Sequence, residues 1–438
     1  MREMKDSGIE WIGAIPQDWK TDRLQWHLKE INVSNNPIQT KNILSLTIEA
    51  GVIPYAEKAN QGNKAKEDYS QYKIAFPDTL VINSMNVIIG AVGISQYFGC
   101  VSPVYYVFEP IEGTDLRYIY YLFTNTGFQK EMRKYAKGIL EIRLRISSND
   151  MLKRIVPSPP FKEQQRIADY LDKMCAEIDA VLEKTRASIE EYKKLKQAVI
   201  TQAVTKGIRG DRPMKDSGIE WIGDIPESWE VSSVRYIGQL QNGISKGGEF
   251  FGKGFPFVSY GDVYKNYELP YSVSGLIDTT EDERATYSVE YGDIFFTRTS
   301  ETIEEVGFSC VCKRSIPNAT FAGFIIRLRP FCADEKILTD YAKYYFRGEH
   351  IRAYLVKEMN LVTRASLGQT LLKGMPVIVP PKSVQKEIAE YLDDKCADID
   401  ALVAKKQQYL TEIENYKKSL IYEYVTGKKE VKTSVLAD

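Results

Sequence analysis

Apolar residues recur at steps of three and four along two long stretches of the chain, and this spacing predicts two long amphipathic helices. A Pro-Pro pair precedes each stretch and a glycine follows it, as is common at the ends of helices. We therefore expect helices over 159–206 and 380–427. The apolar seam of the first is expected to comprise Ile167, Leu171, Met174, Ile178, Val181, Tyr192, Leu195 and Val199, and that of the second Ile388, Leu392, Ile399, Leu402, Ile413 and Leu420.

The charges along these two stretches are divided in the same way. Residues 163–183 hold six acids and two bases, whereas 184–206 hold six bases and two acids. In the second stretch, 384–404 has six acids and two bases, and 405–428 has five bases and three acids. Antiparallel pairing places each acidic half beside a basic half, whereas parallel pairing would place acid beside acid. We predict an antiparallel pair; the alternative is two independent helices whose charges suit their dipoles.

The remaining sequence is rich in strand-like segments. Segments 78–95, 101–110, 292–300 and 322–331 combine β-branched and aromatic residues between turn-forming residues. The predicted fold class is α+β, with two strand-rich domains separated by the two long antiparallel coiled-coil helices and related by an internal pseudo-two-fold symmetry.

Two parts of the sequence occur twice. The segment "MKDSGIEWIGAIPQDW" at 4–19 matches 214–229 at 13 of 16 positions, and 159–182 matches 380–403 at 13 of 24 positions. The similar flanks enclose two dissimilar middles, so we expect a duplicated frame that carries two variable heads. The expected parts are a first head with its leader (1–158), a spacer helix (159–206), a linker (207–213), a second head with its leader (214–379), a second spacer helix (380–427) and a flexible tail (428–438).

The two heads also align with each other at several polar strand ends. Asp78 falls on Asp293, and Asn83-Ser84-Met85 falls on Arg298-Thr299-Ser300. Asn reads adenine and Arg reads guanine through paired hydrogen bonds in the major groove of DNA. These strand ends are therefore candidate base-reading positions; the alternative is that they are polar residues that simply face water.

Each head ends in a basic segment. Residues 130–154 carry eight bases and three acids, and residues 347–373 carry five bases and two acids. A basic surplus at the same place in both halves suggests phosphate contacts, although a solvated amphipathic helix would also explain it. The candidate DNA-binding residues from both patterns are Asn83, Ser84, Lys137, Arg143, Arg145, Arg298, Thr299, Ser300, Arg352 and Arg364.

Composition adds little that would support an enzyme or a metal site. Lys and Arg total 58 against 59 for Asp and Glu, and the two histidines show no metal-ligand spacing. The segment "GGEFFGKG" at 247–254 approaches a phosphate-binding loop, but a glycine stands where Ser or Thr should bind magnesium. We predict no catalytic residues, no bound metal and no membrane span, six cysteines that are mostly reduced, and a cytoplasmic protein.

The repeated leaders, the "PP…EQQRIADYLD" segment with its copy "PP…VQKEIAEYLD", and the endings "AVTKG" and "YVTGK" resemble the DNA-specificity subunit of type I restriction–modification systems. The resemblance implies two target-recognition domains that read a bipartite DNA target across a fixed gap. It also implies partners: double-stranded DNA, two methyltransferase subunits that use S-adenosylmethionine to methylate adenine N6, and endonuclease subunits that use ATP with magnesium. No cofactor is expected in this chain itself.

The resemblance further implies that each leader packs near the helix end that belongs to the other half. Trp11, Trp19, Trp221 and Trp229 would be buried anchors at these two joints. Two other functions remain open. One is a coiled-coil scaffold or adaptor that reads no DNA sequence, and the other is an autonomous DNA methyltransferase. The second is disfavoured because "SPPF" at 158–161 lacks the Asn or Asp that holds the target amino group.

Overall fold

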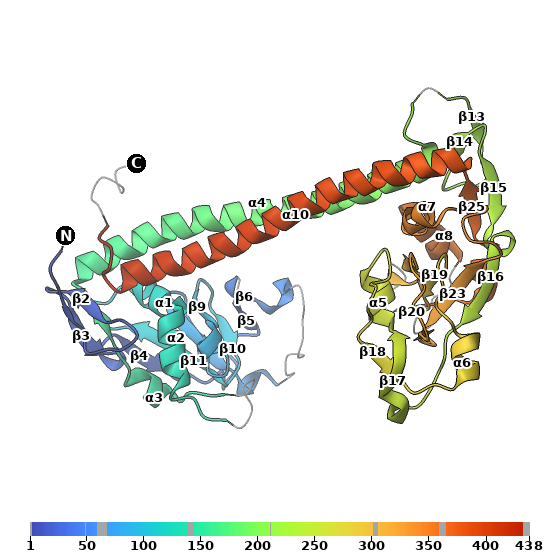
Figure 1. Cartoon of the computed structure of the whole chain (residues 1–438). Coiled ribbons are helices and arrows are strands. Elements are labelled where there is room, and N and C mark those ends of the chain that lie inside the picture. The colour runs from blue at the N-terminus through green and yellow to red at the C-terminus, as the bar shows by residue number, and fades with distance from the viewer. Residues whose placement is uncertain are drawn as a thin grey trace. The chain divides into compact units, whose positions relative to one another are not determined.

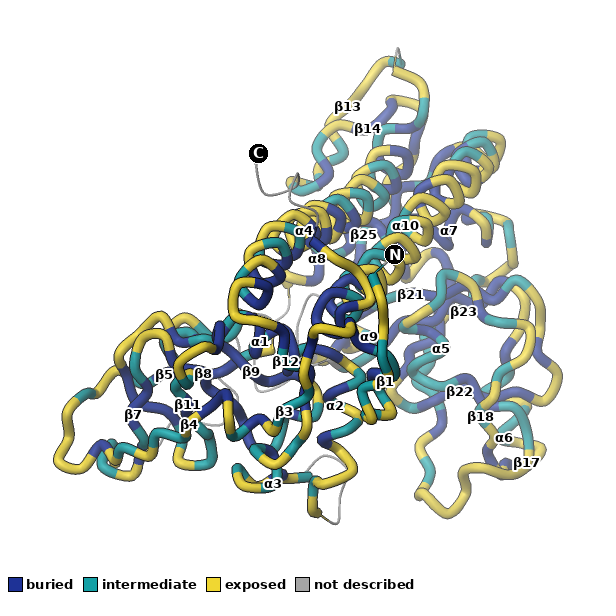
Figure 2. Tube along the Cα trace, turned by 90° about the vertical axis from the view of Figure 1, so that its left-hand side faces the viewer, coloured by how far each residue is buried: buried dark blue, intermediate teal, exposed yellow. Residues whose placement is uncertain are grey.

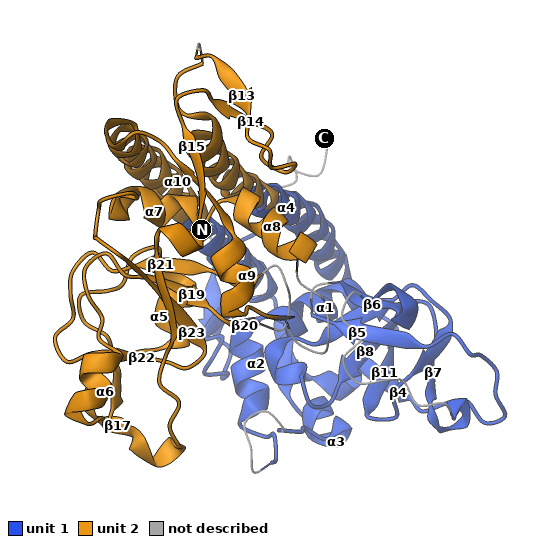
Figure 3. Ribbon diagram, turned by 90° about the vertical axis from the view of Figure 1, so that its right-hand side faces the viewer, with its two compact units in different colours: residues 1–186, 408–438 blue, residues 187–407 orange. Residues whose placement is uncertain are grey.

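The computed structural model describes residues 2–48, 50–58, 68–138, 144–210, 212–300, 305–358 and 365–431. Its helices and strands are labelled in Figure 1, and Figure 2 shows which positions are buried. Contacts divide the chain into two compact units, coloured in Figure 3: unit 1 comprises 1–186 and 408–438, and unit 2 comprises 187–407. The long helices α4 (Phe161–Lys206) and α10 (Lys382–Val425) each contribute residues to both units.

Unit 1 is built on a four-stranded antiparallel sheet in the order β4-β11-β8-β9. Leu80 and Ile82 of the central strand β8 join the core formed with helix α1, while Val81 between them joins a second core with the hairpin β5–β6. This alternation is the period-two pattern of a strand buried on both faces. The elements of the sheet and its two layers are β4 (Leu28–Ile31), β11 (Tyr105–Pro110), β8 (Thr79–Asn83), β9 (Val92–Ser95), β5 (Leu44–Thr47), β6 (Gly51–Pro54), α1 (Leu116–Thr124) and α2 (Thr126–Arg133).

The remaining elements of unit 1 are short. They are β1 (Met4–Asp6), β2 (Ala14–Pro16), β3 (Lys20–Arg23), β7 (Lys73–Ala75), β10 (Gly99–Val101), β12 (Ile155–Ser158), α3 (Ser148–Leu152) and the 3-10 helices η1 (Leu24–Trp26), η2 (Tyr55–Glu57), η3 (Tyr69–Gln71) and η4 (Val87–Ile89).

Unit 2 repeats this topology with the sheet order β16-β23-β19-β21 and adds a three-stranded sheet, β18-β17-β22. Its sheet and covering helices are β16 (Gly238–Asn242), β23 (Ile325–Pro330), β19 (Ile294–Thr297), β21 (Ser309–Val311), α7 (Thr339–Tyr345) and α8 (Glu349–Glu358). The other elements are β13 (Met214–Asp216), β14 (Asp224–Pro226), β15 (Glu230–Ser233), η6 (Val234–Tyr236), η7 (Gly248–Phe250), β17 (Phe251–Val258), α5 (Tyr260–Lys265), β18 (Gly275–Ile277), α6 (Glu281–Thr286), β20 (Thr299–Ser300), β22 (Thr320–Phe321), β24 (Ala365–Ser366), α9 (Gln369–Gly374) and β25 (Pro376–Val379). The two predicted strand-rich heads are thus confirmed.

Strand registers give the equivalence between the two sheets. Pro110 pairs with the first residue of β4, and Pro330 pairs with the first residue of β16. Two residues earlier on each strand, the partners in β8 and β19 are Leu80 and Ile294. Leu80 is therefore equivalent to Ile294, an offset of 214 residues.

The sequence alignment of the strand ends was therefore wrong by one residue. An offset of 214 places Ser84, rather than Asn83, opposite Arg298. The alignment had matched Asp78 to Asp293. However, Asp293 directly precedes Ile294, the residue equivalent to Leu80, whereas Thr79 stands between Asp78 and Leu80. Two similar aspartates at slightly different positions in the turn caused the shift.

The buried seam of α4 differs in part from the predicted one. Val181 and Leu195 are 40% and 48% exposed, so their assignment to the seam was wrong. Cys175, Leu182 and Ile189 are buried in their region of the helix instead. Leu402 of α10, which is 43% exposed, was also assigned to the seam wrongly. Other positions of the predicted seams, such as Ile167 and Leu392, are buried as expected.

The antiparallel pairing of the helices is confirmed within each unit. In unit 1 Lys417 of α10 lies 2.7 Å from Asp179 of α4. In unit 2 Lys196 of α4 lies 2.6 Å from Asp400 of α10. Each ion pair joins a basic half to an acidic half, as the charge pattern predicted. Because these pairs are partly exposed, we expect them to select the orientation more than to add stability.

Each leader packs against the end of the expected helix. In unit 1 the Tyr422 hydroxyl of α10 donates to the Trp11 carbonyl at 3.4 Å, and in unit 2 Lys206 of α4 donates to the Ile222 carbonyl at 2.9 Å. Trp19 and Trp229 are fully buried in these joints, as predicted. Trp11 and Trp221, which were also expected to be buried, are only partly buried; they pack against Phe128 of α2 and Tyr354 of α8.

Within the described part of the chain, no helix is both long enough and apolar enough to cross a membrane.

Candidate nucleic-acid interface

The end of β8 in unit 1 is a tight turn. The Asn83 side chain accepts the Met85 amide hydrogen at 3.0 Å, and the Asn83 carbonyl accepts that of Asn86 at 3.1 Å. Asn83 and Ser84 are both buried. The turn is therefore well ordered by its own hydrogen bonds, but neither predicted side chain faces solvent in this structure.

The basic segment of unit 1 lies beside this turn. Lys137 and Arg145 pair as a two-residue bridge, with backbone hydrogen bonds of 2.7 and 2.9 Å. The Arg145 guanidinium reaches the Met85 sulfur at 3.4 Å, and the next residue donates its amide hydrogen to the Ser84 carbonyl at 3.3 Å. Both basic side chains are exposed. The structure thus joins two separate sequence predictions at one place; Arg143 lies outside the described residues.

The end of β19 in unit 2 is held from two sides. The Arg298 amide donates to the Phe324 carbonyl at 2.8 Å, and the Arg298 carbonyl accepts the Leu367 amide hydrogen at 2.7 Å. Thr299 then pairs with Ser366 in the two-stranded sheet β20–β24. The half-buried Arg298 side chain makes no hydrogen bond or ion pair with a described residue. These two hydrogen bonds fix the backbone of Arg298, and no described residue occupies the hydrogen-bond donors of its guanidinium.

Ser300 pairs through its backbone with Ala365, but its side chain lies outside the described part of the structure, as does Arg364. The roles of these residues stay predictions.

The Arg352 side chain forms hydrogen bonds within the fold of unit 2. Its guanidinium donates to the carbonyls of Val306 and Gly307, with a distance of 3.0 Å to the latter. Burial, with a smaller effect of the nearby Arg347 charge, lowers the pKa of Arg352 to about 10. A guanidinium committed to two backbone carbonyls is poorly placed to contact a phosphate, so this geometry favours a structural role that sequence reasoning missed.

Sequence reasoning also missed three residues near Arg298. Gln369, the first residue of α9, donates to the Asn242 side chain at 3.1 Å at the end of β16. Phe324 is 64% exposed in the turn that accepts the Arg298 amide hydrogen. Amide side chains can read adenine, and an aromatic ring can contact a thymine methyl group. Only the pairing of distant strands reveals that these residues share one end of the sheet.

Part of the basic surplus is neutralised within the chain. Lys134 lies 3.0 Å from Glu10, and Lys357 lies 2.8 Å from Glu220. The two glutamates occupy matching positions in the repeated leaders. These ion pairs link leader to head in both units, which leaves fewer bases for phosphate than the sequence count suggested.

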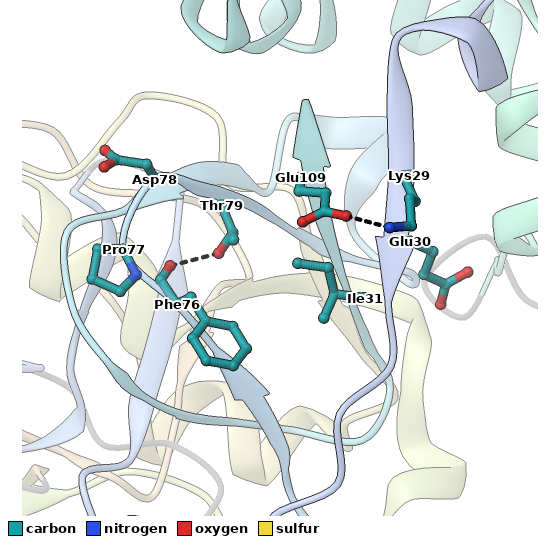
Figure 4. Close-up of a pocket in the computed structure, with 8 residues that line it drawn as sticks. All are labelled: Lys29, Glu30, Ile31, Phe76, Pro77, Asp78, Thr79 and Glu109. Carbon is teal, nitrogen blue, oxygen red and sulfur yellow. Dashed lines mark hydrogen bonds and ion pairs between the residues drawn. The ribbon is translucent and has the colours of Figure 1, made fainter. Parts of the chain in front are cut away.

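A hollow at the other end of the unit 1 sheet is unsuited to nucleic acid. Figure 4 shows that its lining includes Glu30, Asp78 and Glu109. The single lysine there, Lys29, is paired with Glu109 at 2.8 Å. The surplus of carboxylates repels phosphate, so the opposite end of the sheet, where Arg145 lies, remains the better candidate in this unit.

Features of a metal or nucleotide site are not found in the described residues. Within those ranges no group of three or more His, Cys, Asp or Glu side chains is placed to hold a metal ion. Cys312 is buried, which raises its thiol pKa to about 12 and keeps it protonated. The glycine-rich 247–254 segment continues into strand β17 rather than into a helix, so it lacks the phosphate-binding helix N-terminus.

A family model described as the type I restriction modification DNA specificity domain matches residues 16–191 and 226–414. The chain belongs to this family. It is therefore a specificity subunit of the type I restriction–modification class, whose role is DNA sequence recognition. Subunits of this class are generally non-catalytic.

Relatives of this specificity subunit match it along most of its length. The putative type I restriction enzyme MjaX specificity subunit of Methanocaldococcus jannaschii is 25% identical and covers 96% of each chain. The MjaVIII specificity subunit of the same organism is 26% identical over 73% of this chain and 71% of its own. A solved chain from work on complex assembly and conformational transition of the type I R-M system superposes with a TM-score of 0.71 at 15% identity, covering 95% of this chain and 99% of that chain. At this identity, the structural match shows the shared fold alone.

Proposed function

We propose that this subunit reads a bipartite DNA target, with one block read by each unit across a fixed gap. The supporting observation is that one scaffold carries different side chains at equivalent positions. The registers match Ser84 to Arg298, and in each unit the carbonyl at that position accepts an amide hydrogen from a residue within the basic segment, Ile146 or Leu367. A repeated frame with different strand-end side chains suits two different half-sites.

Unit 2 is the unit for which we can propose a base. A guanidinium on a fixed backbone can donate two parallel hydrogen bonds to O6 and N7 of guanine. Arg298 meets this requirement because hydrogen bonds hold both its amide and its carbonyl. We therefore propose that the block read by unit 2 contains a guanine.

The gap between the two blocks would be set by the paired helices. Both α4 and α10 are continuous and contribute residues to both units. Each residue added to an α-helix lengthens it by about 1.5 Å. Shortening both helices by one turn would therefore change the number of unread base pairs but not the bases that are read.

Chemistry would come from the partners. In this proposal two methyltransferase subunits with S-adenosylmethionine methylate adenine N6, and endonuclease subunits with ATP and magnesium carry out restriction. The chain carries a net charge of −1, which suits a subunit that shares its phosphate contacts with others. We expect the isolated chain to bind DNA weakly and with strong salt dependence.

A binding experiment separates this proposal from a scaffold that reads no DNA. Gel shifts would compare the chain alone with the complex that it forms with the methyltransferase subunit encoded beside it. We expect tight, sequence-selective binding only from the complex. An assembled complex that binds all DNA sequences equally would favour the scaffold function, and nanomolar binding by the isolated chain would refute the sharing of phosphate contacts.

A further inference from the structure

Unit 1 contains a cavity of about 720 Å³ between the head and the paired helices. Its walls come from α1 and α2 of the head, the first half of α4 and the second half of α10. Residues that matter below are Tyr120, Tyr121 and Thr124 of α1, Asp179 of α4, and Lys417 and Lys418 of α10.

The position in unit 2 that is equivalent to this cavity can be identified from contacts that occur in both units. Lys417 pairs with Asp179 at 2.7 Å in unit 1, and Lys196 pairs with Asp400 at 2.6 Å in unit 2. On the head side, the Tyr121 hydroxyl donates to an α4 aspartate at 2.7 Å, and the Tyr344 hydroxyl donates to the equivalent α10 aspartate at 2.7 Å. The two places are therefore equivalent, although Tyr120 of the unit 1 wall stands where unit 2 has Lys343.

In unit 2 this place is filled by Tyr267, which follows helix α5. The Gln197 side chain donates to the Tyr267 hydroxyl at 3.2 Å. The Lys196 ammonium lies 5.1 Å from the centre of the Tyr267 ring, and the Tyr344 ring lies 6.0 Å from it. The aromatic ring thus packs against the helix, the head and a lysine at once, which is a favourable cation–π setting.

Arg347 fastens the segment that carries this tyrosine. Its guanidinium donates to the carbonyls of Val263, Tyr264 and Asn266 at 2.7 to 3.1 Å and lies 4.8 Å from the Tyr267 ring. Arg347 therefore holds both the backbone of this segment and the ring of Tyr267 in place.

Unit 1 differs at both of these features. Thr124 stands where Arg347 stands in unit 2, and its hydroxyl donates to the carbonyl of Tyr121 in its own helix. Lys418 stands where Gln197 binds the tyrosine hydroxyl. The place that Tyr267 fills in unit 2 corresponds to the cavity in unit 1, which the described residues leave open.

The charges in the cavity favour a particular occupant. Asp179 is paired with Lys417, and Arg186 is paired with Glu414 at 2.8 Å. Lys418 is exposed and has no ion pair with a described residue. An unpaired ammonium beside an open aromatic position suits a tyrosine or phenylalanine accompanied by a carboxylate. In unit 2 the filling tyrosine is followed by an acid, Glu268, whose carboxylate lies 3.7 Å from Lys313 and 4.0 Å from Lys343 of the head.

We propose that the cavity of unit 1 binds a segment of a partner protein that presents an aromatic side chain followed by an acidic residue. Ile48 and Ile89, which are 58% and 54% exposed at its edge, offer apolar surface for the residues around that side chain. The two halves of the duplicated chain then differ in a further way: unit 2 supplies its own aromatic residue, and unit 1 takes one from outside.

The test uses a peptide that copies the occupant of unit 2. A peptide with the sequence KNYELP (265–270), carrying 3-fluorotyrosine, is titrated with the full-length chain and followed by fluorine NMR. We expect line broadening with a dissociation constant below about 1 mM. A competing peptide with alanine in place of tyrosine should displace the labelled peptide at least tenfold less well.

Matched chain variants locate the binding. Ala176, an exposed residue of the cavity wall, is changed by Ala176→Trp, which fills the cavity and should abolish binding. Ala404→Trp, at an exposed helix position that does not line the cavity, should leave binding unchanged. Lys418→Gln should weaken binding severalfold, because it removes the unpaired ammonium.

Three results would overturn the inference: no broadening at millimolar chain, equal competition by the alanine peptide, or binding that survives Ala176→Trp. The measurement contains no DNA, so its outcome is independent of the proposed DNA reading.

Discussion

Replacing Arg298 tests how unit 2 reads its target. The Arg298 amide and carbonyl are held by hydrogen bonds of 2.8 and 2.7 Å, and its side chain has no described hydrogen-bond or ion-pair partner. Arg298→Ala therefore removes a guanidinium without breaking a contact known to stabilise the fold. We expect the variant to assemble normally and to unfold at nearly the wild-type temperature.

The magnitude follows from the contact proposed for this side chain. A bidentate contact between Arg and guanine discriminates against other bases by about 1 to 3 kcal/mol. This corresponds to a preference of roughly 5- to 150-fold, since about 1.4 kcal/mol is a factor of ten. Arg298→Ala should lose this preference at one base pair of one half-site.

The assay is the methylation pattern of host DNA when the variant is co-expressed with its methyltransferase subunit. We expect one position of one half-site to become degenerate and the other half-site to remain unchanged. Arg298→Lys is the matched control, because lysine keeps the charge but loses the bidentate geometry. Its motif should be relaxed at the same position.

Other results would separate the explanations. If Arg298 contacts only a phosphate, Arg298→Lys should keep the full motif and Arg298→Ala should weaken methylation at all sites evenly. An unchanged motif in Arg298→Ala would refute base reading by this residue. Loss of selectivity at both half-sites would refute the division of reading between the two units.

Three further predictions concern stability. Glu163→Val should lower the unfolding free energy of unit 1 by about 2 kcal/mol in urea titrations, because Glu163 accepts hydrogen bonds from Trp19 and Arg2, both at 3.0 Å; a change under about 0.5 kcal/mol would contradict this. Arg352→Ala should lower the melting temperature by leaving two backbone carbonyls without their donor; an unchanged melting temperature with reduced methylation would instead indicate a DNA contact. Burial lowers the pKa of His350 to about 3, whereas the unfolded chain binds the proton with a pKa of about 6.5. The buried neutral imidazole therefore contributes its full stability to the fold above about pH 6.5, and this contribution is lost as the pH falls towards 3. The wild type should lose about 1 kcal/mol between pH 7 and pH 5.5 from this residue, and His350→Leu should lose correspondingly less; equal losses would refute the assignment.

The helices show what the sequence could predict. The same acidic-to-basic order of charges along 163–206 and 384–428 indicated antiparallel pairing, because charge complementarity depends on whole helix halves rather than on single side chains. The apolar seam was less predictable. Val181 and Leu182 are neighbours, and only the packed structure shows that Leu182 faces inward. The predicted seam also omitted Cys175, although a free cysteine packs well in a core.

The candidate site was predictable only in part. Sequence alone indicated the strand ends and the basic segments, and the structure shows that contacts between distant segments bring Arg145 beside the turn that contains Ser84. Sequence could not show that the Arg352 guanidinium donates hydrogen bonds to carbonyls 45 and 46 positions earlier in the chain. It also could not place Gln369 beside Asn242, since that contact depends on the tertiary arrangement of α9 and β16.

Modified-base sequencing of host DNA tests the central claim most directly. The wild-type chain would be co-expressed with its neighbouring methyltransferase subunit, and assembly of the two would be verified by size. The account predicts a motif of two short specific blocks, separated by a fixed number of unread base pairs and each containing an N6-methyladenine. A continuous motif without a gap, or no methylation from a complex that has assembled, would contradict it.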